Sequence, residues 1–257
     1  MNKSIVVIIG AGQLGSRHLQ GVLKANVEIK VYVVEPLEQS REVAATRANE
    51  ISHHHELVFC SNINEIPQNI DLVIVATNSN VRFKVLTELL GHARVETLIL
   101  EKVLFQLEKE YHDALALLEK HNVNCYVNHP RRMQDFYKNL RDQLNHLSGE
   151  SIVISAYGVN WGLGCNGLNL SDLFCYLLDD RIANYETKCL DTQIIKSKRS
   201  GYYEFTGTLE GRTEKGSQFQ IHSKAPELDE LMPISIVISA PSKRIFIQES
   251  SLTTITH

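Results

Sequence analysis

The chain has 257 residues, enough for one large domain or two modest ones with a stable apolar core. Hydrophobic residues make up 43% of it and charged residues 22%, a balance typical of ordinary globular proteins rather than disordered or membrane proteins. The formal net charge is -4 and no Lys/Arg-rich run is present, so the sequence carries no electrostatic footprint for a nucleic-acid partner.

The first predicted element is the apolar run at residues 5–9. It is too short to span a membrane, and a glycine turn follows it instead of a signal cleavage site. We therefore predict a buried strand here and expect no membrane partner.

The rest of the first half repeats one unit, in which a short apolar run precedes a longer stretch of helical periodicity. This alternation is typical of parallel strands linked by helices, and uninterrupted apolar strands suit a sheet covered on both faces. We predict an α/β domain with a parallel sheet over residues 1–127. The expected strands are residues 5–9, 29–34, 72–76, 98–100 and 125–127, and the expected helices are residues 14–25, 37–50, 81–90 and 108–121.

The pattern changes after Asn128, where strands divided by Gly, Pro and charged turns become more frequent than helices. We predict an α+β domain with a mostly antiparallel open sheet over residues 128–257. Its expected helices are residues 133–147 and 168–178, and its expected strands are residues 152–159, 202–209, 219–223, 234–239 and 244–248.

Cysteine and histidine usage gives no metal site. The cysteines are odd in number and widely spread, and none forms a C-x-x-C pair, so we expect reduced thiols in a cytoplasmic protein. The run His53-His54-His55 has no cysteine or acidic partner at metal-ligand spacing, and we expect a solvated loop there. The cysteines are Cys60, Cys125, Cys165, Cys175 and Cys189.

A G-x-G-x-x-G motif lies between the first predicted strand and the first predicted helix. In a Rossmann turn, Gly10 permits the tight turn, Gly12 lets the backbone approach a pyrophosphate, and Gly15 allows close packing of helix and strand. Gln13 and Leu14 then open the helix, whose free N–H groups and dipole attract phosphates. The sequence therefore predicts a dinucleotide-binding Rossmann domain.

Glu35 closes the second predicted strand, twenty residues after the last glycine of the motif. A carboxylate there accepts hydrogen bonds from the adenosine ribose and repels a 2′-phosphate, which favours NAD over NADP. Arg41, one helical turn further on, leaves NADP open, and a solvated strand-end Glu35 is the alternative interpretation.

Several segments together resemble the glucose-fructose oxidoreductase and inositol dehydrogenase (Gfo/Idh/MocA) family, which joins a Rossmann domain to an open-sheet domain. The matching segments are residues 10–15, Val75-Ala76-Thr77-Asn78, Glu101-Lys102-Val103, residues 127–132 and residues 164–172. The resemblance implies that Thr77, Asn78, Glu101 and Lys102 contact the cofactor. It also implies that the second domain binds substrate and mediates oligomerisation.

Glu101-Lys102-Val103 is similar to the family's Glu-Lys-Pro signature, which implies a catalytic Lys102 beside the nicotinamide and the substrate hydroxyl. An ammonium there stabilises negative charge that develops on oxygen during transfer. A lone Lys at a strand end is otherwise a surface residue. Asn128, Arg131 and Arg132 resemble the family's Asn-x-Arg segment and imply substrate contacts, with an arginine pairing with a carboxylate or phosphate.

Residues 161–174 resemble the family's Asp-x-Gly-x-His-x-x-Asp segment, in which His is the general acid/base. Asp172 matches, but Cys165 replaces the Asp and Asn169 replaces the His, and an amide exchanges no proton near neutral pH. Lys102 is then the alternative proton-transfer group, if burial lowers its pKa. The same resemblance implies substrate contacts by Trp161, Cys165, Asn166 and Asp172, although Trp161 alternatively fills the domain core.

These features together predict an NAD(P)-dependent oxidoreductase of a sugar or nucleotide-linked sugar. As family analogy, the Gly-Leu-x-Cys-Asn run is similar to enzymes of surface-polysaccharide or nonulosonic-acid synthesis. Apolar strands in the second half predict a homodimer or higher homo-oligomer. The alternative function is that of a dinucleotide-binding regulatory or scaffolding protein without dehydrogenase activity.

Overall fold

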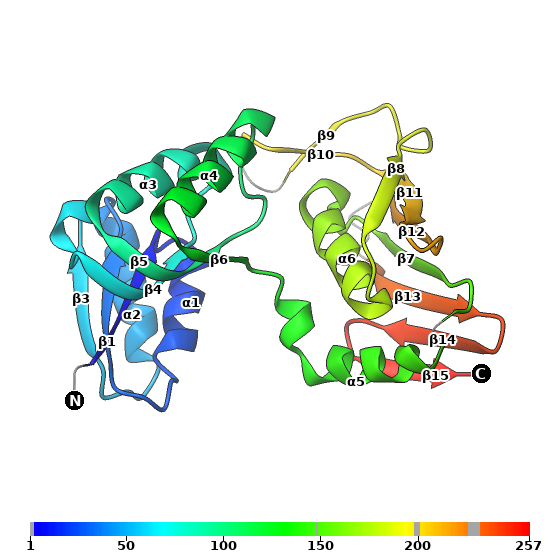
Figure 1. Ribbon diagram of the computed structural model, residues 1–257, viewed down its shortest axis with the longest axis horizontal. Coiled ribbons are helices and arrows are strands. Elements are labelled where there is room, and N and C mark those ends of the chain that lie inside the picture. The colour runs from blue at the N-terminus through cyan, green and yellow to red at the C-terminus, as the bar shows by residue number, and fades with distance from the viewer. Residues whose placement is uncertain (1–2, 148, 198–200, 226–231) are drawn as a thin grey trace. The chain divides into compact units, whose positions relative to one another are not determined.

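The computed structural model describes residues 3–147, 149–197, 201–225 and 232–257. The chain forms two compact units, Met1–Asn128 and His129–His257 (Figure 1). Among the described residues, no helix is long and apolar enough to cross a membrane.

The first unit is built on a six-stranded sheet in which every neighbouring pair is parallel. The strand order β3-β2-β1-β4-β5-β6 reverses direction between β1 and β4, the topological switch point at which such sheets bind ligands. The predicted α/β Rossmann fold is confirmed. The strands are β1 (Ser4–Ile9), β2 (Ile29–Val34), β3 (Glu56–Cys60), β4 (Asn69–Val75), β5 (Arg94–Leu100) and β6 (Asn124–Val127).

Helices cover both faces of this sheet, which explains why its strands are apolar at successive positions. Ile8 packs in one core with Leu19, and Ile9 packs in the other with Leu86. One layer contains α1 (Gly15–Val22) and α2 (Glu38–Asn49); the other contains α3 (Ser79–His92) and α4 (Glu108–His121), with the short 3-10 helix η1 (Ile63–Glu65) beside α3 (Figure 1).

The second unit is built on a seven-stranded sheet of order β15-β14-β13-β7-β12-β11-β8, antiparallel except for the β7–β12 pair. The predicted, mostly antiparallel α+β architecture is confirmed. The strands are β7 (Val153–Val159), β8 (Ile182–Glu186), β11 (Gly207–Thr213), β12 (Gln218–Lys224), β13 (Met232–Ala240), β14 (Lys243–Gln248) and β15 (Thr253–Thr256), and β9 (Ile195–Lys196) pairs with β10 (Tyr203–Glu204) in a separate two-stranded sheet.

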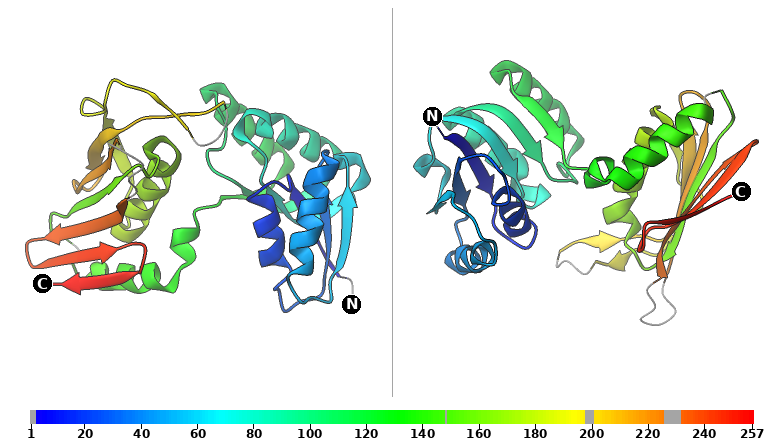
Figure 2. Two further views of the ribbon diagram at one scale, coloured as in Figure 1. Left: turned by 180° about the vertical axis from the view of Figure 1, so that it is seen from behind. Right: turned by 90° about the horizontal axis from the view of Figure 1, so that it is seen from below.

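One face of the seven-stranded sheet packs against α5 (Asp135–Leu144) and α6 (Leu163–Leu178) (Figure 2). Tyr137 of α5 and Phe174 of α6 are fully buried in the same core as Phe219 and Ile236 of the sheet. No helix of the described residues covers the opposite face. Short 3-10 helices, η2 (Pro130–Met133) and η3 (Asn145–Leu147), flank α5.

Three expectations about local structure were wrong. The expected strand at residues 202–209 is divided between β10 and β11, which Phe205 and Thr206 separate, and β11 begins at Gly207 with a φ of +97°. Helix α6 begins at Leu163 rather than at residue 168, so two of the glycines in the singled-out segment are helical. His55 is buried, 8% exposed, with Nε2 3.2 Å from the carbonyl oxygen of Ala25, although a solvated loop was expected.

Candidate functional site

The turn between β1 and α1 requires glycine at two positions for different reasons. Gly10 has φ of +89°, and a Cβ on Gly15 would lie 1.8 Å from the carbonyl oxygen of Gly10. Gly12, by contrast, has no atom within 4 Å of where its Cβ would be. The backbone at Gly12 is therefore unobstructed, and a pyrophosphate can approach it closely.

The N-terminus of α1 supplies donors beside this stretch of backbone. Within the described residues, the backbone N–H groups of Gly12, Gln13 and Leu14 donate to no protein acceptor. Arg47 of α2 holds the Gln13 side chain, with 2.6 Å between Nη2 and Oε1. Unpaired N–H groups at the positive end of a helix form an anion site, which suits a diphosphate.

Glu35 lies just after β2 and is only 8% exposed, so it is not a solvated strand-end residue. Its Oε2 accepts from the N–H of Ala11 at 2.8 Å and its Oε1 from the N–H of Leu37 at 3.1 Å. A carboxylate has about four acceptor positions, which leaves capacity for ribose hydroxyls. Arg41 donates to the carbonyl oxygens of Glu35 and Pro36, at 2.6 and 3.0 Å.

Thr77 and Asn78 follow β4 on the other side of the switch point. The hydroxyl of Thr77 is buried without a hydrogen-bond partner in the described part of the chain, and its Cγ2 lies 3.0 Å from where a Cβ on Gly10 would be. Asn78 is the residue before α3. An unsatisfied buried hydroxyl beside the glycine turn is a candidate contact for a bound cofactor.

Lys102 lies two residues after the end of β5, in a loop that a buried arginine holds in place. Arg82 of α3, 2% exposed, donates to the carbonyl oxygens of Glu101 at 2.6 Å and Leu104 at 2.8 Å, and also to that of Thr77. The peptide bond after Lys102 is cis. Arg82 thereby ties the loop that carries Lys102 to the end of β4.

Glu101 is the centre of a second buried contact. It is 3% exposed, and its Oε1 lies 2.7 Å from Nε2 of His18 and 2.5 Å from Nδ2 of Asn128. Burial raises the pKa of Glu101, but the hydrogen bonds from His18 and Asn128 and the charge of Arg82 outweigh it and leave the pKa lowered. The ionised carboxylate thus anchors Asn128 beside the loop that carries Lys102.

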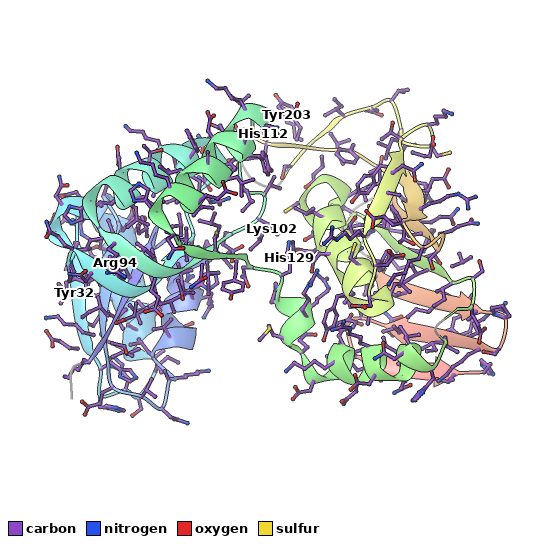
Figure 3. All side chains as sticks on the ribbon, viewed as in Figure 1. Tyr32, Arg94, Lys102, His112, His129 and Tyr203 are labelled. Carbon is purple, nitrogen blue, oxygen red and sulfur yellow. The ribbon has the colours of Figure 1, made fainter. Side chains whose placement is uncertain are left out.

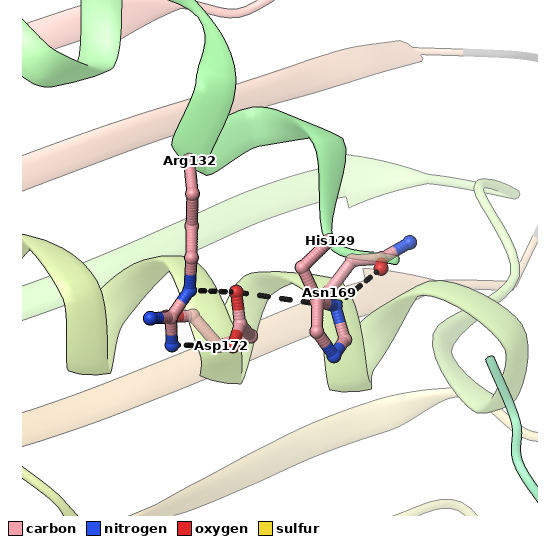
Figure 4. A network of polar contacts seen from close by, with 4 residues as sticks. All are labelled: His129, Arg132, Asn169 and Asp172. Carbon is pink, nitrogen blue, oxygen red and sulfur yellow. Dashed lines mark hydrogen bonds and ion pairs between the residues drawn. The ribbon is translucent and has the colours of Figure 1, made fainter. Parts of the chain in front are cut away.

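In the second unit, four polar side chains form a network (Figure 4). Nδ1 of His129 lies 3.1 Å from Oδ1 of Asn169 and 3.9 Å from Oδ2 of Asp172. Arg132 donates to both carboxylate oxygens of the same Asp172, from Nε to Oδ2 at 2.7 Å and from Nη2 to Oδ1 at 2.5 Å. Asn169 and Asp172 are three residues apart on α6 and therefore share one helix face.

Arg131 is also paired within the protein. Its guanidinium contacts both carboxylate oxygens of Glu249, with Nη2 3.0 Å from Oε2, and the Tyr137 hydroxyl donates to Oε1 at 3.1 Å. Burial raises the pKa of Tyr137, which keeps this hydroxyl protonated. Both predicted substrate arginines, Arg131 and Arg132, therefore already have a carboxylate partner from the chain itself.

The segment around the start of α6 is organised by a buried acid. Glu204 is 8% exposed, and its Oε2 accepts from the N–H of Cys165 at 3.2 Å. Trp161, 9% exposed, donates from Nε1 to the carbonyl oxygen of His222 at 3.0 Å, and Asn166 donates to the carbonyl oxygen of Trp161 at 2.7 Å. Trp161 therefore belongs largely to the core of the second unit.

Some of the predicted substrate residues surround a hollow of about 660 Å³ in the second unit. Arg132, Cys165, Asn169 and Asp172 do not line it. Its polar and aromatic lining includes Arg131, Asn160, Trp161, Asn166 and Glu249.

Sequence reasoning missed four residues of these contacts: His18, Arg82, His129 and Glu204. His129 lies inside a segment that the resemblance had already singled out, and its ring chemistry was the available signal. The other three contact partners distant in the chain, and nothing in their local sequence distinguishes them from solvated residues.

Comparisons with known proteins agree with this geometry. A sequence model of the GFO_IDH_MocA oxidoreductase family, NAD-binding Rossmann fold, matches residues 5–129. No curated protein sequence matches the chain.

Solved structures share the fold at low identity. An NAD-binding protein from Listeria innocua is 17% identical with a TM-score of 0.73, over 99% of this chain and 76% of the other. Myo-inositol dehydrogenase from Lactobacillus casei, in complex with NAD(H) and myo-inositol, is 14% identical with a TM-score of 0.71, over 99% and 74%. UDP-N-acetylglucosamine 3-dehydrogenase from Acidithiobacillus ferrooxidans is 13% identical with a TM-score of 0.71, over 100% and 81%.

Proposed function

We propose that the chain is an NAD-dependent dehydrogenase or reductase of a sugar or nucleotide-linked sugar, of the Gfo/Idh/MocA oxidoreductase family whose NAD-binding Rossmann model matches residues 5–129. The observation that carries the proposal is the cradle at the switch point, where open N–H groups at Gly12 and the buried carboxylate of Glu35 follow adjacent strands. Similar structures that are dehydrogenases of a cyclitol and of a nucleotide-linked sugar support the substrate class.

The cradle residues fit NAD. Gly12, Gln13 and Leu14 offer N–H groups to the diphosphate, and Glu35 has acceptor capacity for the ribose hydroxyls. A 2′-phosphate beside Glu35 would be repelled, which supports NAD over NADP. When bound, NAD supplies the acceptor or donor of a hydrogen with its electron pair.

Lys102 is the residue that we assign to the substrate oxygen. Its ammonium donates to the hydroxyl or carbonyl oxygen and stabilises negative charge there as the C–H bond breaks or forms. Arg82 fixes the carbonyl oxygens on either side of it, at Glu101 and Leu104, and so limits the movement of its backbone. Figure 3 labels Lys102 in the loop that follows β5.

The second unit supplies the substrate contacts in this proposal. The hollow lined by Arg131, Trp161 and Asn166 combines an aromatic side chain with hydrogen-bonding groups, a combination that suits a hydroxylated ring. A place in surface-polysaccharide or nonulosonic-acid synthesis is the finer form of the proposal and rests on family analogy alone.

We further propose that the uncovered face of the seven-stranded sheet joins two copies of the chain. Val237 of β13, Phe246 of β14 and Ile255 of β15 are paired across adjacent strands on this face, and Phe246 and Ile255 are 39% and 63% exposed. Apolar side chains that gather on one face are typical of an association surface.

A dinucleotide-binding protein without dehydrogenase activity is the second candidate. Two observations favour it. Asn169 carries an amide where the family's segment has a general acid/base His, and Arg131 and Arg132 are each paired with a carboxylate of the chain itself. Such a protein would bind NAD and oxidise nothing.

Nicotinamide absorbance during incubation with NAD⁺ and either myo-inositol or UDP-N-acetylglucosamine separates the two candidates. We expect turnover by the wild type and its loss in Lys102→Met with NAD⁺ affinity nearly unchanged. The control Lys84→Met, at a position on α3 whose side chain is 80% exposed, should keep wild-type rates. NAD⁺ binding without turnover of either compound favours the second candidate. No NAD⁺ binding would refute both.

A further inference from the structure

Arg131 and Glu249 are the charged side chains among the described residues that line the hollow of the second unit, and they are paired with each other. We propose that this pair makes the hollow selective for the uncharged ring of a sugar or polyol, and that it excludes rings that carry a carboxylate or a phosphate. The inference rests on the dehydrogenase function proposed above and narrows its substrate class.

The first argument is that the guanidinium of Arg131 already has its counter-ion. Its Nε and Nη2 donate to Oε1 and Oε2 of Glu249, the latter at 3.0 Å, and the Tyr137 hydroxyl donates to the same Oε1 at 3.1 Å. The side chains of Arg131 and Glu249 are only 20% and 14% exposed. Burial lowers the pKa of Arg131, but the contact with Glu249 outweighs it and leaves the pKa raised, so the pair stays ionised.

The second argument is what an anionic ring would meet in the hollow. If it displaced Glu249 from Arg131, a largely buried carboxylate would lose its cationic partner, which is strongly unfavourable. If the pair stayed intact, the anion would lie close to the like charge of Glu249. No other described lining residue is a lysine, arginine or histidine. Either arrangement therefore weakens the binding of an anion.

The third argument is what the hollow offers to an uncharged ring. Glu249 accepts only two of the five N–H groups of Arg131, so donors remain for hydroxyl oxygens. Asn166 donates from Nδ2 to the carbonyl oxygen of Trp161, and its Oδ1 can accept from a hydroxyl. The indole of Trp161 adds an apolar surface, and a volume of about 660 Å³ is within the range of small-molecule sites.

Glu249 is therefore the residue that determines the charge of the ligand. Glu249→Gln keeps the size of the side chain and removes its negative charge, so Arg131 becomes available to a carboxylate of the ligand. The variant should consequently gain affinity for an anionic ring, an effect that a merely structural role of Glu249 would not produce.

The direct test uses the fluorescence of Trp161, the only tryptophan of the chain, which lines the hollow. Full-length protein with NAD⁺ is titrated with the methyl glycosides of glucose, galactose and N-acetylglucosamine, and with the matched uronates, which carry a carboxylate at C6. We expect at least one neutral ring to bind, and at least about tenfold more tightly than its uronate. A uronate that binds as tightly as its neutral partner, or no binding of any neutral ring, would overturn the proposal.

The variant provides the second readout. We expect Glu249→Gln to bind the uronate about tenfold or more tightly than the wild type does, with the affinity for the neutral ring changed less than about threefold. The control Asp142→Asn, at an exposed position of α5 that does not line the hollow, should keep the wild-type ratio. A folded Glu249→Gln with an unchanged ratio refutes the role of Glu249, and the wild-type comparison decides the proposal if this variant does not fold.

Turnover distinguishes failure of this inference from failure of the proposed function. Wild-type protein that turns over a uronate with NAD⁺ keeps the dehydrogenase and overturns the selectivity. A neutral ring that binds together with NAD⁺ and is not turned over, like every other neutral ring that binds, refutes the dehydrogenase and supports the selectivity.

Discussion

We expect replacement of the buried guanidinium of Arg82 to destabilise the folded protein. Arg82→Met would leave the carbonyl oxygens of Glu101, Leu104 and Thr77 without their shared charged donor. Each unsatisfied buried acceptor costs about 1–3 kcal/mol, and partial access of water reduces the sum, so we expect a loss of about 3–5 kcal/mol. This is a large part of the 5–15 kcal/mol that typically stabilises a folded protein.

Thermal unfolding followed by circular dichroism measures this loss. At about 2–4 °C per kcal/mol for a chain of this size, Tm of Arg82→Met should fall by about 6–20 °C. Arg82→Lys keeps the positive charge but loses the planar guanidinium with its several donors, so its Tm should lie between those of the wild type and Arg82→Met. The matched control is Lys84→Met on the same helix. The Lys84 side chain is 80% exposed and its Nζ lies 3.7 Å from Oε1 of Glu88, so its replacement should change Tm little. If Tm of Arg82→Met stays within a degree of the wild type, Arg82 does not hold the loop.

Three further predictions follow from single groups or surfaces. Because the pKa of Glu101 is lowered in the folded protein, its ionised form stabilises the fold above about pH 4.5, and this contribution is lost as the pH falls through the folded pKa. The difference in free energy of unfolding between wild type and Glu101→Gln should therefore shrink in acid. A difference that stays constant with pH would contradict this. Burial raises the pKa of Cys125 to about 11, so its thiol should react slowly with an alkylating reagent. Mass spectrometry after brief iodoacetamide treatment should find the exposed Cys165 alkylated and Cys125 unmodified. Equal labelling of the two cysteines would show that Cys125 is accessible. Light scattering at micromolar concentration should show a dimer of the wild type and a monomer of Phe246→Glu, and a monomeric wild type would remove the sheet face as an interface.

The sequence predicted the parts of the fold that depend on local patterns. Uninterrupted apolar runs and the glycine turn at Gly10 and Gly15 were sufficient for five of the six strands of the parallel sheet, because strand burial and turn sterics act over a few residues. The division of residues 202–209 was missed because it depends on Gly207 packing against Cys189, where a Cβ would lie 2.5 Å from a carbonyl oxygen. No periodicity in the strand itself carries that information.

The candidate site was less predictable, because most of its contacts join residues that are far apart in the sequence. Glu35 follows the glycine turn at a regular spacing and was found, whereas Arg82 and His18 resemble ordinary helix residues until their partners are known. His129 contacts Asn169 forty residues later, and only the folded second unit brings the two together. The substitution of His by Asn at position 169 was visible, but the imidazole beside it was not.

The central claim is that the cradle at the glycine turn binds NAD, and isothermal titration calorimetry with NAD⁺ and NADP⁺ tests it most directly. We expect the wild type to bind NAD⁺ at least about tenfold more tightly, which corresponds to about 1.4 kcal/mol. Glu35→Ala should narrow this difference, because the variant loses an acceptor for the ribose and the repulsion of a 2′-phosphate. Wild-type protein that prefers NADP⁺, or that binds neither cofactor, would contradict the account.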